Sequence, residues 1–168
     1  LDGLERIDLD TARALAAFDK RLYLRGLATL DADVAAVLAD FKGWLHLDGL
    51  KHLDATNAQV LAGAAAQELT LQGLTGIDGK TAATLAAFKG NDLGLGGLRS
   101  LDAETAGALA GFKGGHLDLG GLKALSADAA EALAKYENRW LALDGLATLD
   151  APTAERLAEC RCDLLTLG

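Results

Sequence analysis

The sequence is short of several features that define large classes of proteins. It has two cysteines, one proline and no methionine among 168 residues, so it is not a scaffold held together by many disulfides. No run of about 18 apolar residues occurs, which excludes a membrane-spanning helix. Glycine does not recur at every third position, which excludes a collagen triple helix.

Clustered positive charge is also missing. The chain carries 16 Lys and Arg against 24 Asp and Glu, a formal net charge of −8. Nucleic acid and anionic membrane surfaces are therefore poor candidate partners, because both are bound through basic clusters. The first residues lack a signal-peptide pattern, which leaves the compartment open between the cytoplasm and a secreted or surface location.

The residues that are abundant indicate an ordered repeat. Hydrophobic residues make up 51% of the chain, too many for a disordered segment. Leucine and alanine together fill 70 positions, and a Gly-Leu pair returns every 23 or 24 residues, a period typical of solenoids and propellers. The pair begins at Gly3, Gly26, Gly49, Gly73, Gly97, Gly121 and Gly145.

This period predicts that residues 1–168 form a single solenoid with no linker or second domain. Its seven units begin at Leu1, Leu24, Leu47, Leu71, Leu95, Leu119 and Leu143. Terminal repeats of a solenoid usually carry a polar outer face, and no such cap is visible at either end. We therefore expect the chain to be a fragment of a longer array, or a segment within one.

Each unit combines a strand pattern with a helix pattern. The alternation Leu117-Asp118-Leu119 predicts a short strand with one buried face. Asp102 predicts a helix N-cap, and the spacing of Ala106, Leu109 and Ala110 forms one apolar stripe on the helix that follows. The equivalent N-caps in the other units are Asp8, Asp31, Asp54, Asp78, Ser126 and Asp150.

Glycines are expected to end both elements. Gly97 and Gly121 should turn the chain after its strand, so bulky substitutions there should be among the most damaging. Gly114 is predicted to end its helix in a left-handed conformation, with Asn138 in the same role one unit later. In the third unit Ala64-Ala65-Ala66 replaces Phe-Lys-Gly, so that helix is expected to run on.

The predicted fold follows from having only one strand per unit. Successive strands must pair between units and run parallel, and the helix supplies the crossover that a parallel pair needs. The sequence therefore predicts an α/β solenoid with a curved parallel sheet and its helices on the opposite, convex side.

The pattern resembles the leucine-rich repeat family over all seven units. The alternating leucines, the Gly-Leu pair and a later leucine are present, as in Leu117 to Leu125. The position that holds Asn in the family holds leucine here, so the chain looks like an atypical bacterial subclass without the Asn ladder. The resemblance implies the scaffold and a binding surface on the concave strand face, but no specific activity.

Residues that alternate with the buried leucines should point outward and form that surface. Aromatic and charged side chains gather in the first half, a mixture common in recognition hot spots. We define the N-terminal patch as Tyr23, Arg25, Trp44, His46 and Asp48, and predict that it binds a protein or peptide, with Gln72 and Trp140 as further candidates. The alternative is that these residues are simply tolerated on the surface of a structural array.

The hypotheses of a catalytic site and of a metal site have less support. His46 could meet Asp48 and Glu68, and His116 could meet Asp92 and Asp118, but neither group has a second histidine, and charge pairing explains both. No nucleophile, base and orienting residue share a usable spacing, and no motif indicates a cofactor. We therefore expect neither an enzyme nor a metal site.

The two cysteines fall in the last unit. Cys160 takes the position held by Phe18, Phe41, Phe88, Phe112 and Tyr136 in other units, so it is expected to be a buried thiol. A bond to Cys162, only two residues away, is expected to be sterically unfavourable.

Two functions remain in competition. One is a non-catalytic scaffold that binds a protein or peptide on its concave face. The alternative is a structural protein that stacks end to end or packs in a larger complex, because leucine-lined ends are expected to be exposed.

Overall fold

A computed structural model describes residues 3–168, and the predicted start of the first unit at Leu1 lies outside this range. Helices and strands alternate along it. The helices are α1 (Leu9–Ala16), α2 (Ala32–Leu38), α3 (Ala55–Ala62), α4 (Gly79–Leu85), α5 (Ala103–Ala110), α6 (Ala127–Leu133) and α7 (Ala151–Leu157). The strands are β1 (Arg21–Tyr23), β2 (Trp44–His46), β3 (Glu68–Thr70), β4 (Asp92–Gly94), β5 (His116–Asp118), β6 (Trp140–Leu143) and β7 (Leu164–Leu167).

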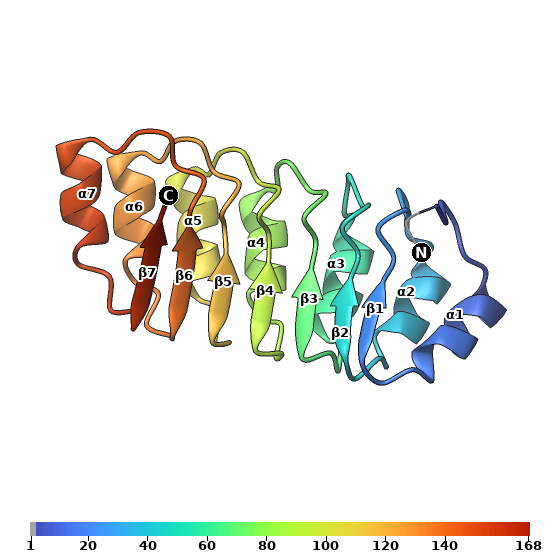
Figure 1. The fold of residues 1–168 in the computed structure, drawn as a ribbon. Helices are drawn as coiled ribbons and strands as arrows, with labels where there is room; N and C mark the ends of the chain where they lie inside the picture. Colours follow the sequence, from blue (N-terminus) through green and yellow to red (C-terminus); the bar gives the residue numbers. More distant parts are fainter. Residues whose placement is uncertain (1–2) are drawn as a thin grey trace.

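The strands form one open sheet in sequence order, β1 to β7, and every neighbouring pair is parallel. The helices lie along one side of this sheet, as Figure 1 shows. Packed helices need about 8–10 Å between axes, whereas paired strands are only about 4.8 Å apart. The helical side must therefore be the longer one. The fold is the predicted α/β solenoid, with the strands on the concave side.

The core lies between the sheet and the helices. Each central strand places one leucine inward and a second follows it, as with the fully buried Leu93 and Leu95. The helix stripe predicted from Ala106, Leu109 and Ala110 is buried against them. Alanine is suited to these helix positions because a larger side chain would push the neighbouring helix away.

The predicted helix starts are confirmed at all seven N-caps. The Asp102 carboxylate accepts from the backbone N–H of Thr105 at 2.7 Å, and the Ser126 hydroxyl does the same for Ala129 at 3.2 Å. Four of these aspartates are followed, three positions later, by a threonine that donates hydrogen bonds to them. These bonds lower the pKa of Asp8, Asp78, Asp102 and Asp150. Asp31 also occupies the N-cap position of its helix, but its side chain makes no capping hydrogen bond.

The predicted helix ends were wrong. Among the described residues no glycine or other residue has a positive φ, so neither Gly114 nor Asn138 is a left-handed cap. Helix α5 ends earlier, at Ala110, with Gly111 as a right-handed C-cap. Helix α3 does not run on either, because it ends at Ala62 with Gly63 as its C-cap.

The glycines at the strand ends are required by close packing between units. A Cβ on Gly121 would collide with the carbonyl oxygen of Gly96 in the preceding unit, and a Cβ on Gly97 would collide with that of Gln72. The same obstruction recurs at Gly49, Gly73 and Gly145. These glycines are thus explained by contact between neighbouring backbones and not by an unusual turn conformation.

The cysteine prediction was also wrong, because Cys160 and Cys162 form a disulfide, with their Cα atoms 5.5 Å apart. An earlier unit shows why both side chains fit. There the ring of Phe112 occupies the space that a Cβ on Gly114 would take. In the last unit Cys160 and Cys162 take the positions equivalent to Phe112 and Gly114, and no ring occupies the space between them.

No helix within residues 3–168 is long and apolar enough to cross a membrane.

Candidate functional site

The strand register arranges the outward side chains in rows across the concave face. The strand centres, such as Leu45 and Leu69, point into the core. The residues on either side of them form two rows that face outward. The first row is Arg21, Trp44, Glu68, Asp92, His116, Trp140 and Leu164, and the second is Tyr23, His46, Thr70, Gly94, Asp118, Ala142 and Thr166.

The N-terminal patch is brought together by these rows. The rings of Tyr23 and His46 stack with centroids 4.2 Å apart and planes 12° from parallel. The Arg25 guanidinium lies 4.7 Å from the Tyr23 ring centroid, and its Nε is 3.7 Å from Asp48 Oδ2. The Tyr23–His46 and Arg25–Asp48 contacts join neighbouring strands or their continuations, whereas the Arg25–Tyr23 contact joins residues two positions apart in the chain.

Arg21 belongs with this patch, although the sequence did not single it out. Its guanidinium lies over the Trp44 ring, 3.7 Å from the centroid. A cation over an indole face is attracted by the ring's negative face. The signal was present in the sequence, because Arg21 and Trp44 are 23 residues apart, one repeat period.

His46 was expected to be exposed, but it is only 8% exposed. Its Nδ1 lies 2.8 Å from Thr70 Oγ1, and that hydroxyl donates to Asp48 Oδ1 at 2.6 Å. Because the Thr70 proton is used on Asp48, the pair with His46 requires Nδ1 to be the donor. The chain of bonds fixes the imidazole and leaves Nε2 as the lone-pair nitrogen when the ring is neutral.

His46 Nε2 faces Glu68 on the next strand, with 3.8 Å to Oε1. This distance is too long for a hydrogen bond, and Nε2 is buried without a partner. Burial lowers the pKa of His46, and the nearby Arg25 and Arg21 lower it further against an opposing effect of Asp48. Burial, followed by repulsion from Asp92, raises the pKa of Glu68.

Gln72 was expected to point outward as a binding candidate, but its side chain is held by another residue of the face. Its Nε2 donates to Asp118 Oδ2 at 2.9 Å, so the side chain crosses β4 to reach β5. The crossing is possible because β4 and its continuation carry Gly94 and Gly96 on this face. A Cβ on Gly96 would collide with Gln72 Oε1.

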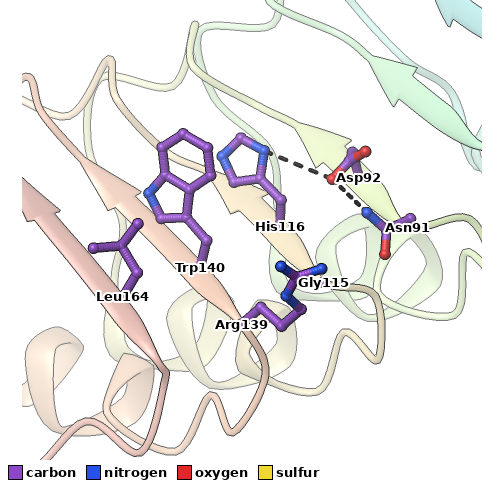
Figure 2. Close-up of a pocket in the computed structure, with 7 residues that line it drawn as sticks. All are labelled: Asn91, Asp92, Gly115, His116, Arg139, Trp140 and Leu164. Atoms are coloured by element: carbon purple, nitrogen blue, oxygen red, sulfur yellow. Dashed lines mark hydrogen bonds and ion pairs between the residues drawn. The ribbon is translucent and has the colours of Figure 1, made fainter.

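Trp140 lies at the other end of the face, beside a pocket of about 220 Å³. The pocket is lined by Asn91, Asp92, Gly115, His116, Arg139, Trp140 and Leu164. Figure 2 shows the His116 and Trp140 rings facing each other, with Asp92 beyond the imidazole and Leu164 beyond the indole.

The contacts at this pocket are also ordered. The His116 and Trp140 centroids are 4.0 Å apart, and His116 Nδ1 lies 3.8 Å from Asp92 Oδ1. Asn91 Nδ2 donates to the same Asp92 oxygen at 2.8 Å. Trp140 stays 37% exposed, so its indole is available to a ligand.

The sequence predicted which residues are register neighbours on the strand face, but it did not reveal the pocket. It indicated Trp140 as a binding candidate and predicted that His116 could meet Asp92, which the structure confirms at 3.8 Å. It missed Asn91 and Arg139, because they precede their strands and do not follow the alternation. Within residues 3–168 no three His, Cys, Asp or Glu side chains form a group able to hold a metal ion.

A comparison of the chain with protein-family models and with curated protein sequences finds no match.

Proposed function

We propose that the chain is a non-catalytic recognition scaffold that binds a protein or peptide across its concave strand face. The observation that carries the proposal is the arrangement of aromatic, imidazole and charged side chains in contact with one another on that face. The resemblance to leucine-rich repeats supports it, since the concave face is the usual binding surface of that family.

The order of these side chains favours binding. Ordering a long side chain on association costs about 0.5–1.5 kcal/mol. Here Arg21 is already placed on Trp44, Tyr23 on His46, and His116 on Trp140. A ligand that contacts these groups therefore avoids much of that cost, and aromatic and Arg side chains are the types enriched at binding hot spots.

The spacing favours an extended ligand. The N-terminal patch is centred on β1 and β2, whereas the pocket lies over β4 to β7. From β2 to β5 is three strand steps, or about 14 Å at about 4.8 Å per step. A peptide segment lying across the strands can reach both, over the glycine-lined surface of β4.

A random peptide library displayed on phage tests the proposal. Peptides selected on the native chain are measured against Trp44→Ala and Trp140→Ala variants. Binding should fall by about tenfold or more for at least one of them, as loss of a hot-spot aromatic costs about 2 kcal/mol. Lys135→Ala, on the exposed helical side, is the control. Equal binding to all three variants would place the interaction off the concave face and reject the proposal.

Self-association is the second candidate function. Within residues 3–168 strand β7 pairs with β6 alone, and Leu164 and Leu167 on it are 48% and 44% exposed. Further repeats of a longer chain would cover the same edge. Light scattering over a range of concentrations discriminates: growth to open-ended polymers supports assembly, and a constant small mass argues against it.

A further inference from the structure

The centre of the concave face holds two neighbouring carboxylates, Glu68 and Asp92, of which Asp92 accepts one hydrogen bond, from Asn91. Glu68 and Asp92 are register neighbours on β3 and β4, and their side chains are 18% and 27% exposed. Each carboxylate has only a histidine as its ionic neighbour, at 3.8 Å. Two half-buried carboxylates side by side repel each other, so this arrangement is unfavourable until a cation joins it.

The second and independent observation is His46. Its side chain is 10% exposed, its Nε2 has no partner, and that nitrogen is directed at Glu68. Since Nδ1 donates to Thr70, Nε2 of the neutral ring can only accept. A buried acceptor without a donor is costly, and this one lies beside a carboxylate that also accepts.

The cations of the chain do not fill this position. Arg21 acts on Glu68 from a distance and lowers its pKa, but its guanidinium is held over Trp44. Arg25 pairs with Asp48. Arg139, which precedes β6, lines the pocket, and no ion pair joins it to Asp92 among the described residues.

We infer that this centre binds a cationic side chain, arginine or lysine, presented by the partner protein or peptide. The N–H donors of that side chain would bridge Glu68 and Asp92, which are register neighbours, and reach His46 Nε2, which faces Glu68. The inference rests on the proposed function and specifies the partner: a basic segment, opposite in charge to the middle of the face.

The test uses Nα-acetyl-arginine amide as the probe and Nα-acetyl-citrulline amide as its uncharged isostere. Both are titrated into the full chain and followed by amide NMR. The arginine probe should shift amide signals of residues 68–70 and 92–94 and the ring signals of His46, and the citrulline probe should not. Glu68→Gln and Asp92→Asn should each weaken binding by about tenfold, the value of one charge-assisted hydrogen bond.

Two further variants test whether affinity for the arginine probe depends on the charge at this centre. Asp144→Asn removes an exposed carboxylate from the same face at β6 and should leave binding unchanged. Arg139→Gln removes a positive charge from the pocket and should strengthen binding of the arginine probe. Circular dichroism verifies that every variant remains folded.

The inference is overturned if arginine and citrulline shift the same signals, or if Glu68→Gln weakens binding no more than Asp144→Asn. Its failure can be separated from failure of the scaffold proposal. Selected peptides that depend on Trp44 or Trp140 but contain no preferred Arg or Lys would reject the cationic site and retain the scaffold. Peptides rich in Arg or Lys that are insensitive to Glu68→Gln would reject the site as well.

Discussion

At the residue scale, the chemistry of each outward side chain depends on the units on either side. His46 illustrates this: Tyr23 of the preceding strand covers one face of its ring, and Thr70 of the following strand fixes its Nδ1. The result is an imidazole with one satisfied and one unsatisfied nitrogen. An isolated unit could produce neither the burial nor the tautomer.

The His46 environment makes a testable prediction about its protonation. Burial is the main cause that holds its pKa below 6.5, so its NMR titration midpoint should lie below that value. Because the folded pKa is the lower one, the neutral ring is favoured by folding. Its contribution to stability is present above pH 6.5 and decreases as the pH falls toward the folded pKa.

Substitution of Arg25 tests how nearby charges contribute to the lowered pKa of His46. Arg25 repels the protonated ring, and Asp48, Arg21 and Glu68 are the other charged groups that face it. Arg25→Gln should therefore raise the His46 midpoint. Arg99→Gln, which lies beyond β4, should not move it. A midpoint at or above 6.5 in the native chain would contradict the burial of His46.

At the scale of the element, short strands and helices are held by a few repeated devices. The helices have only seven or eight residues, too short to be stable alone in water. N-cap side chains satisfy the first free N–H groups, and strand-end glycines allow the backbones of adjacent units to touch. The N-caps and the strand-end glycines recur in each unit because each unit packs against its neighbours in the same way.

The N-cap gives a prediction at this scale. Asp102→Ala should lower the thermal unfolding midpoint, because the N–H of Thr105 loses its acceptor. Asp102→Ser should retain most of the stability, as Ser126 is the natural cap of α6. The lowered pKa of Asp102 means that its contribution is present above pH 3.8 and is lost as the pH falls through the folded value.

Comparing Asp102→Ala with Asp102→Ser also separates the capping hydrogen bond from the negative charge of Asp102. Below the folded pKa of Asp102, the native chain and the alanine variant should approach each other in stability, whereas the serine variant should not change in this range on account of residue 102. Circular dichroism melts from pH 2 to pH 7 measure the difference. Equal melting of the alanine and native chains at neutral pH would contradict the capping role.

The strand-end glycine gives a second prediction. Gly121→Val would force a side chain into the carbonyl oxygen of Gly96, so the free energy of unfolding should fall by about 3 kcal/mol or more. Gly76→Val is the matched control, since nothing lies within 4 Å of a Cβ there. Denaturant titration of both variants is the measurement, and equal midpoints would show that units do not touch at Gly121.

At the scale of the whole molecule, stability comes from stacking. Each strand pairs with its sequence neighbours, and no strand within residues 3–168 pairs with a distant one. In such one-dimensional folds the stability is approximately a sum of unit and interface contributions. The molecule should therefore tolerate the loss of a whole unit far better than the loss of half of one.

Deleting residues 95–118 tests this property. The deletion joins Gly94 to Leu119 and keeps the strand and helix register, so the shortened chain should retain a cooperative transition with a lower midpoint. Deleting residues 95–106 removes half a unit, breaks the register and should abolish cooperative unfolding. Circular dichroism and gel filtration distinguish the two. Similar loss of folding in both would mean that the stacking is not modular.

The sequence by itself determined the period, the single strand per unit, the direction of pairing and the helix starts. These features depend on local patterns: alternation of leucines, the i to i+4 stripe and an N-cap residue. They also repeat seven times, so one irregular unit such as Ala64-Ala65-Ala66 does not obscure them. The outward rows followed directly, because period and alternation together fix which residues are register neighbours.

The tertiary structure alone decided the burial of His46, the reach of Gln72 to Asp118, the pocket beside Trp140 and the Cys160–Cys162 bond. It also showed that Gly114 is not a left-handed helix end, and that the strand-end glycines are required by close contact with the preceding unit. The physical reason is common to all of them. Each depends on the volume and shape of side chains one or two periods away, and a pattern along the chain specifies which residues are neighbours but not how much space they leave.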